Sequence, residues 1–172
     1  MQTFKQKLNN IKAFAFDVDG VLSGGVVIQP EGGVMRTMNA KDGYALQLAH
    51  KLGYPIAIIT GASSEAIAKR FEALGITDIY LKSASKIKDF EDFIMRYELS
   101  TDQVLYMGDD IPDYQIMEKT GVATCPSDAA PEIKSISHYI SDIPGGQGCV
   151  RDVLEQTLKV QNKWLTGEAF EW

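Results

Sequence analysis

The sequence predicts an α/β fold with a doubly wound parallel sheet, because short apolar runs alternate with amphipathic helical segments along the chain. The runs are apolar throughout, which suits strands covered by helices on both faces of a parallel sheet. The length of 172 residues and the apolar content of 45% are sufficient for one globular core. We therefore expect a single domain over residues 1–172, without internal repeats or linkers.

The first strand is expected in the apolar run at 11–20, which ends in Asp17, Asp19 and Gly20. Two carboxylates at the exposed end of a strand repel one another unless a cation lies between them. Magnesium suits this position, because it binds through a few carboxylates and the oxygens of a phosphate. The motif is thus a candidate site of phosphoryl transfer with an aspartyl nucleophile, although aspartate and glycine also end strands simply because they suit turns.

A β-hairpin flap is expected next, at about 24–38, because glycine and proline separate two β-prone runs. Helices are then expected at 42–52 and 64–74, since Gly53 and Gly75 follow their last apolar positions. The other expected elements are strands at 56–59, 78–81 and 104–107, helices at about 86–97, 112–120 and 148–163, segments that continue the alternation at 121–124, 129–134 and 138–140, and a tail at 164–172.

Charge and cysteine content exclude several classes of protein. The net charge of −6 argues against a general nucleic-acid binder, which needs a basic surface. Cys125 and Cys149 are too few and too far apart for a disulfide framework or a zinc site, so two reduced thiols are expected. The polar first ten residues lack a signal-peptide core, and no apolar run is long enough to span a bilayer. We expect a cytoplasmic protein with neither nucleic acid nor membrane as a partner.

Two polar positions follow predicted strands and begin predicted helices. Thr60 and Gly61 come directly after the strand at 56–59, where a hydroxyl and free backbone N–H groups suit a phosphate. An ordinary serine N-cap is the alternative for this segment. Lys86 begins a predicted helix, where the helix dipole disfavours a cation. A lysine there suits a neighbouring phosphate and aspartate, although an exposed, solvated lysine is also possible.

Three further carboxylates, those of Asp109, Asp110 and Asp113, follow the strand at 104–107. Such a cluster needs either solvent or a cation. The alternative is an acidic loop that caps a helix beginning near Pro112, since carboxylates are favourable at a helix N-terminus. Ligands of doubly wound sheets bind beyond the carboxyl ends of the strands, so we expect these motifs to meet there.

As an ordered set, these motifs resemble those of the haloacid dehalogenase superfamily, over residues 11 to about 160. The resemblance implies that Asp17 is the nucleophile that forms an aspartyl phosphate. It implies that Asp19 gives a proton to the leaving oxygen and then takes one from the attacking water. Thr60 and Lys86 are implied to hold the oxygens of the transferring phosphoryl group.

The same resemblance implies a magnesium ion held by Asp17, the backbone carbonyl of Asp19, and Asp109. Asp113 is implied either to support the metal shell or to pair with Lys86, and Asp110 could take either role. The dehalogenases of the superfamily lack the second aspartate of the first motif and need no metal. The presence of Asp19 therefore favours a phosphatase.

No cap domain is expected, because only a hairpin follows the first motif and few residues separate Leu81 from Lys86. The hairpin and the segments at 39–44, 68–76 and 144–151 resemble a capless subfamily that contains 3-deoxy-D-manno-octulosonate 8-phosphate phosphatase. This resemblance implies a sugar-acid phosphate as substrate and a homotetramer in which one subunit helps to close a neighbour's site. A catalytically silent assembly module is the alternative from another class.

The candidate substrate-binding residues are Gly61, Arg70 and Lys41. One hypothesis is that Arg70 binds the sugar-acid carboxylate across a subunit boundary, since a guanidinium fork suits that group. A solvated helix arginine is an equal alternative. Gln147 and Lys41 stand where arginine is frequent in the subfamily, so a nine-carbon, sialic-type sugar acid phosphate is the alternative substrate.

The C-terminal tail carries three aromatic residues, Trp164, Phe170 and Trp172. A free monomer has little reason to expose such side chains. We therefore expect the tail to dock on a subunit or to reach a neighbouring site.

Overall fold

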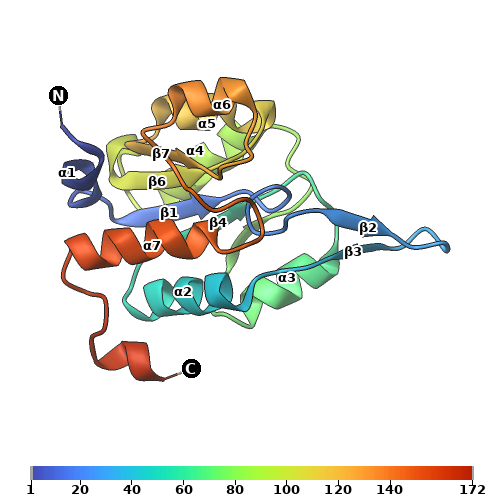
Figure 1. The fold of residues 1–172 in the computed structure, drawn as a ribbon, viewed down its shortest axis with the longest axis horizontal. Coiled ribbons are helices and arrows are strands. Elements are labelled where there is room, and N and C mark those ends of the chain that lie inside the picture. The colour runs from blue at the N-terminus through green and yellow to red at the C-terminus, as the bar shows by residue number, and fades with distance from the viewer. Residues whose placement is uncertain (1, 172) are drawn as a thin grey trace.

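The computed structural model describes residues 2–171, and in this part of the chain six parallel strands form one sheet (Figure 1). The strands lie in the order β5-β4-β1-β6-β7-β8, and every neighbouring pair is parallel. Their bounds are β1 Ala13–Phe16, β4 Ile56–Ile59, β5 Asp78–Tyr80, β6 Val104–Met107, β7 Val122–Cys125 and β8 Tyr139–Ile140. The predicted doubly wound α/β fold is confirmed.

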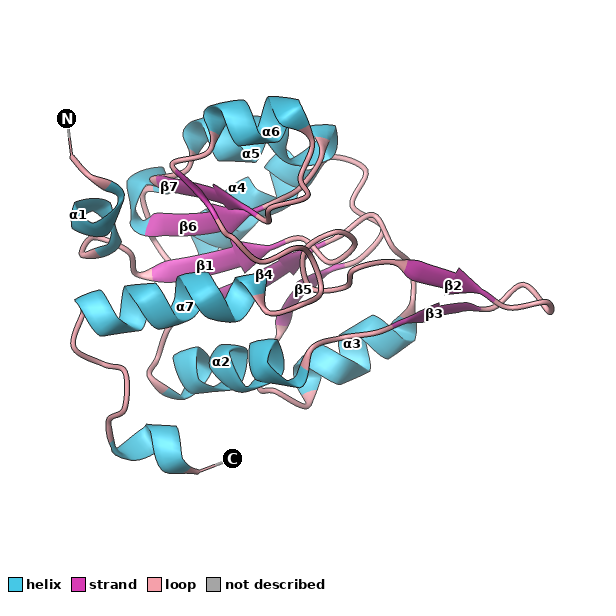
Figure 2. Ribbon diagram, in the orientation of Figure 1, coloured by secondary structure: helices cyan, strands magenta, loops and turns pink. Residues whose placement is uncertain are grey.

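Helices cover both faces of the sheet (Figure 2). One face carries α1 Phe4–Leu8, α2 Ala40–Lys51, α3 Glu65–Glu72 and α7 Cys149–Val160, and the other carries α4 Lys86–Arg96, α5 Tyr114–Lys119 and α6 Pro131–Ile136. Strand β1 serves both cores, since Phe14 and Phe16 point to the first and Ala13 and Ala15 to the second. Within residues 2–171, no helix combines the length and apolar character needed to cross a bilayer.

Two helices differ from the sequence-based expectation. Helix α1 was not anticipated, because its five residues are stabilised by a capping box between Thr3 and Gln6 rather than by apolar periodicity. The helix expected at 112–120 begins as the 3₁₀ turn η2 Ile111–Asp113 and continues as α5. Within residues 2–171, the other 3₁₀ turns are η1 Thr101–Gln103 and η3 Gly167–Phe170.

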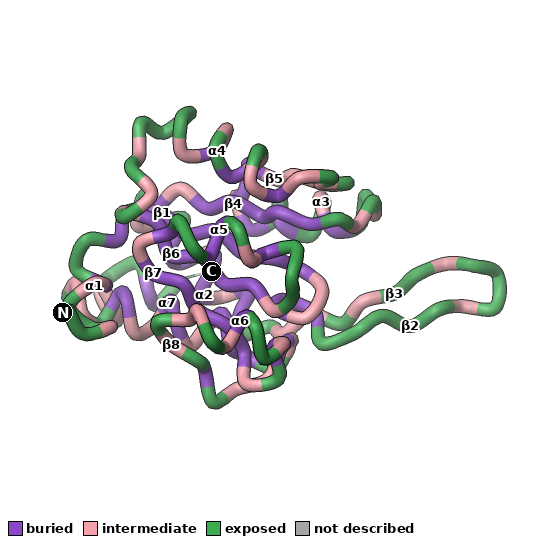
Figure 3. The backbone as a smooth tube through the Cα atoms, turned by 90° about the horizontal axis from the view of Figure 1, so that it is seen from above, coloured by how far each residue is buried: buried purple, intermediate pink, exposed green. Residues whose placement is uncertain are grey.

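A hairpin of β2 Val26–Ile28 and β3 Val34–Arg36 projects from the body of the molecule (Figure 3). Its apolar side chains are largely exposed, with Ile28 at 76% and Val27 at 61%. This hairpin occupies the place after β1 where a cap could be inserted, and residues 2–171 contain no cap domain. The predicted flap without a cap is confirmed.

The C-terminal segment lies along α2 of its own chain (Figure 1). The Tyr44 hydroxyl donates to the Ala169 carbonyl at 2.6 Å, and the Arg151 guanidinium lies 5.1 Å from the centroid of the Trp164 ring. Trp164 therefore has an intramolecular packing site, a contact that the sequence did not reveal. Phe170 is 76% exposed, and Trp172 lies outside the described residues.

Candidate active site

The carboxyl ends of three neighbouring strands bring the polar motifs together. In the register of the sheet, Phe16 pairs with both Ile58 and Met107, so β1, β4 and β6 end at the same edge. A cleft of about 330 Å³ opens there. Its lining residues are Asp17, Asp19, Thr60, Gly61, Ala62, Ser83, Lys86, Asp109, Asp110, Pro112 and Asp113.

Two glycines let the acidic loops approach one another. Gly20 has φ +90°, and a Cβ there would lie only 1.9 Å from Oδ2 of Asp109. A Cβ on Gly108 would lie 2.4 Å from Cγ of Asp113. These positions therefore require glycine to keep the carboxylates that follow β1 and β6 in one cleft.

Lys86 lies between two carboxylates. Its side chain is 9% exposed, and Nζ is 2.8 Å from Oδ1 of Asp17 and 2.7 Å from Oδ1 of Asp113. Burial opposes the charged form of Lys86, but Asp113 and Asp17 outweigh it and hold the lysine pKa above its ordinary value. This pairing accounts for a buried cation at the first residue of α4.

Asp113 joins Lys86 to the loop after β6. Its carboxylate accepts hydrogen bonds from Lys86 Nζ at 2.7 Å, from the Tyr106 hydroxyl at 2.6 Å and from the Asp109 N–H at 3.1 Å. Burial raises the pKa of Tyr106 well above its ordinary value, so the phenol remains a neutral donor. The sequence left open whether Asp113 supports a metal or pairs with Lys86. In the structure, Asp113 pairs with Lys86.

The acidic cluster fits a divalent cation. Oxygens of Asp17, Asp109 and Asp113 lie within 4.8 Å of one another. Burial raises the pKa of Asp17, and the charge of Asp113 raises it further; the same two causes raise the pKa of Asp109. Buried carboxylates with raised pKa values and only oxygen donors suit a hard cation such as Mg²⁺, which relieves their repulsion.

Thr60 and Gly61, which follow β4, also line the cleft. Thr60 is buried, and its hydroxyl oxygen accepts the Ala62 N–H at 3.1 Å. The hydroxyl hydrogen therefore remains able to donate to a ligand. A Cβ on Gly61 would meet nothing within 4 Å, so the space beside this residue is open.

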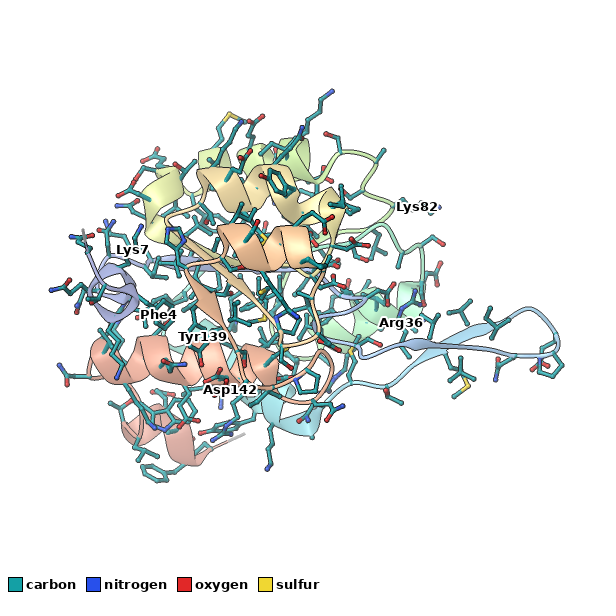
Figure 4. All side chains as sticks on the ribbon, turned by 45° about the horizontal axis from the view of Figure 1, so that its top comes forward. Phe4, Lys7, Arg36, Lys82, Tyr139 and Asp142 are labelled. Atoms are coloured by element: carbon teal, nitrogen blue, oxygen red, sulfur yellow. The ribbon has the colours of Figure 1, made fainter. Side chains whose placement is uncertain are left out.

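Asp19 stands at the mouth of the cleft with its side chain 40% exposed. Arg36, which lies where the hairpin meets the body of the molecule (Figure 4), donates to Asp19 twice, from Nε to Oδ1 at 2.6 Å and from Nη2 to Oδ2 at 2.9 Å. Neither Arg36 nor Tyr106 was among the site residues predicted from the sequence. Tyr106 carried a signal, because a phenol within a buried apolar strand needs a hydrogen-bond partner; no local pattern marked Arg36.

Of the remaining candidates, Asp110 lines the cleft, whereas Lys41 and Arg70 do not. The Asp110 carboxylate accepts the Ile111 N–H at 2.8 Å and caps η2, as the acidic-loop alternative predicted. Lys41 is exposed in the first turn of α2 and does not line the cleft. Arg70 lines a second hollow of about 350 Å³ between β3 and α3, which Arg36 also lines. Within one chain, the structure does not bring Lys41 or Arg70 to Asp17.

Comparisons with known proteins support this geometry. The model of a protein family described as "haloacid dehalogenase-like hydrolase" matches residues 75–148. The chain is 35% identical to the 3-deoxy-D-manno-octulosonate 8-phosphate phosphatase of Escherichia coli (strain K12) over 158 residues, which are 91% of this chain and 84% of that protein. The chain therefore belongs to the family of this phosphatase. The Yersinia pestis phosphatase is 32% identical over 92% of this chain and 85% of its own.

Solved structures of phosphatases have the same fold as this chain. The Moraxella catarrhalis 3-deoxy-D-manno-octulosonate 8-phosphate phosphatase, in complex with magnesium ion, phosphate ion and KDO, has a TM-score of 0.90 and 33% identity, covering 94% of this chain and 93% of its own. The Yersinia pestis enzyme has a TM-score of 0.90 and 32% identity, covering 93% and 87%. The chain is thus a phosphomonoester hydrolase, a sugar phosphatase of the haloacid dehalogenase type with a divalent-metal site.

Proposed function

We propose that the chain hydrolyses 3-deoxy-D-manno-octulosonate 8-phosphate to the free sugar acid and phosphate. The main support is the buried contact of Lys86 with Asp17 and Asp113 at the edge where Thr60 also lies. This arrangement provides a carboxylate nucleophile, a charged lysine and a hydroxyl donor around one cleft. The names of the relatives support the choice of sugar acid.

Two aspartates divide the work in the proposed reaction. An oxygen of Asp17 attacks phosphorus, the bond from phosphorus to the sugar oxygen breaks, and Asp19 gives that oxygen a proton. In the second step, Asp19 takes a proton from water, and the water oxygen displaces Asp17 from phosphorus. Phosphate leaves and Asp17 is restored. The Thr60 hydroxyl and the Lys86 ammonium group hold the phosphoryl oxygens in both steps.

The proposed cofactor is Mg²⁺, held by Asp17, the backbone carbonyl of Asp19, and Asp109. Asp113 supports this set through its bond from the Asp109 N–H, and Asp110 supports it by capping η2. When bound, the cation offsets negative charge on the phosphoryl oxygens.

We further propose that residues 1–172 are one catalytic domain that assembles as a homotetramer. The open cleft and the exposed apolar hairpin support assembly, since such a surface gains stability when another copy covers it. Contacts from a neighbouring copy give Arg70 and Lys41 a route to the sugar-acid carboxylate, while Gly61 leaves room for the substrate. The unpaired thiols of Cys125 and Cys149 suit the reducing cytoplasm.

Steady-state kinetics with Mg²⁺ on eight- and nine-carbon keto-acid phosphates tests the proposal. We expect the highest kcat/KM for the eight-carbon substrate and no turnover by Asp17→Asn. A preference for the nine-carbon substrate would instead support a sialic-type phosphatase. Unchanged turnover in Asp17→Asn would refute the assigned nucleophile.

A further inference from the structure

The hairpin supplies an arginine to the mouth of the cleft. Arg36 lies at the end of β3, yet its side chain is only 13% exposed, whereas Val34 and Met35 beside it are 48% and 55% exposed. Its guanidinium fork takes both oxygens of Asp19, at 2.6 and 2.9 Å. Arg36 therefore folds back from a projecting hairpin onto the body, where the two meet (Figure 4).

The backbone that carries Asp19 is already fixed by hydrogen bonds. The Gly20 N–H donates to the Ser23 carbonyl at 2.8 Å, and the Ser23 N–H donates to the Val18 carbonyl at 2.8 Å. The freedom that remains is rotation of the partly exposed Asp19 side chain. A two-bond fork restrains both the direction and the plane of a carboxylate, which a single ammonium contact does not.

We propose that Arg36 is a positioning residue, which aims the carboxylate of Asp19 for proton transfer and thereby makes the hairpin part of the catalytic apparatus. The inference rests on the proton-transfer role proposed for Asp19. Because a carboxylate has about four lone-pair sites, a fork that takes two of them leaves others free toward the cleft. Arg36 orients the group without occupying the position of the proton.

Two matched substrates separate positioning from general damage. Phenyl phosphate has a basic leaving oxygen that needs a proton, whereas 4-nitrophenyl phosphate has a weakly basic one that does not. Neither ester carries a carboxylate. A difference between them in an Arg36 variant therefore cannot come from lost binding of a substrate carboxylate by Arg36. The ratio kcat/KM reports the steps up to cleavage of the ester bond, and kcat also includes hydrolysis of the phosphoenzyme by water.

In Arg36→Ala, we expect kcat/KM for phenyl phosphate to fall by about 10²-fold, the scale of a misplaced proton donor. For 4-nitrophenyl phosphate we expect kcat/KM to change by less than about 3-fold, while kcat and KM fall together because water activation is slowed. Arg36→Lys keeps the charge but not the fork, so it should show the same pattern with a smaller loss. Thr37→Ala, an exposed neighbour on the hairpin, is the control that should change neither substrate.

The Asp19→Asn variant tests the underlying assignment separately. If Asp19→Asn discriminates between the two esters and Arg36→Ala lowers kcat/KM for both alike, Arg36 has a merely structural role and our inference is wrong. Unchanged kinetics in Arg36→Ala would also overturn it. If Asp19→Asn itself does not discriminate, the proposed proton-transfer role of Asp19 fails instead. Circular dichroism and the oligomer size of each variant verify that the protein is folded.

Discussion

Replacing Asp42 by asparagine should stabilise the protein above pH 6. Asp42 lies in α2 with 1% exposure, and one carboxylate oxygen accepts the Arg151 N–H at 2.7 Å in the first turn of α7. The other oxygen, Oδ2, has no hydrogen-bond partner among the described residues. Burial raises the pKa of Asp42 from 3.8 to about 6, and the backbone bond and the charge of Arg151 offset only part of this rise.

The magnitude and sign follow from this shift. The folded protein binds the proton of Asp42 more tightly than the unfolded chain does, so the free energy of unfolding falls as pH rises from 3.8 to about 6. A shift of about two pKa units corresponds to about 3 kcal/mol, fully expressed above pH 6. That shift already includes the attraction of the charge to the N-terminus of α7. Asparagine keeps an acceptor for the Arg151 N–H, but its amide N–H groups take the place of Oδ2, which has no partner among the described residues, at a cost of about 1 kcal/mol. We expect a net gain of about 2 kcal/mol at pH 8.

Urea denaturation followed by circular dichroism measures this gain. Wild type and Asp42→Asn are compared at pH 8, 6 and 4.5, at one protein concentration and with a chelator present. The advantage of Asp42→Asn should shrink as the pH falls, because the wild-type carboxyl becomes protonated. Asp142→Asn, at an exposed position, is the matched control and should show no such trend. A variant that is less stable at pH 8, or equally stabilised at every pH, would show that the buried charge of Asp42 does not destabilise the protein.

Three further predictions concern the cleft. The affinity for Mg²⁺, measured by calorimetry, should rise with pH. Burial raises the pKa values of Asp17 and Asp109, so the cation competes with protons for these carboxylates. Equal affinities at pH 6 and pH 8 would contradict this. Asp113→Ala should lower the free energy of unfolding by about 3–5 kcal/mol in urea denaturation, because Lys86 loses one of its buried partners. A loss below about 1 kcal/mol would argue against the pairing of Lys86 with Asp113. Arg70→Ala should raise KM for the sugar-acid phosphate and leave KM for an aryl phosphate unchanged; a wild-type KM for the sugar-acid phosphate would exclude Arg70 as its carboxylate ligand.

The sequence predicted the parallel sheet and the edge where the polar motifs meet, because apolar runs and strand ends are local features. Lys86 was identifiable since a cation at a helix start needs a compensating partner. Its contact with Asp113, by contrast, depends on where α4 and the loop after β6 come to lie in three dimensions. The pairing of Arg36 with Asp19 depends in the same way on how the hairpin folds back, and no periodicity encodes that.

The site assignments themselves had unequal support in the sequence. Asp17 and Asp109 follow apolar strands directly, so their meeting could be expected from sheet topology alone. Arg70 and Lys41 were named only through resemblance, and in one chain they lie outside the cleft. Their assigned roles depend on contacts between subunits, which the pattern of a single chain does not contain.

The lengths of the outermost strands limit how another molecule can pair with the main sheet. At the two edges of the main sheet, β5 has three residues and β8 has two, and the Asp78 carboxylate at the start of β5 is bound by Arg96 at 2.6 Å. Edges this short offer few backbone groups to a strand from another molecule, which protects the sheet from open-ended stacking. The hairpin instead exposes paired strands with apolar side chains. In the proposed homotetramer, the hairpin is therefore the surface suited to contacts between copies, and the short sheet edges disfavour uncontrolled aggregation.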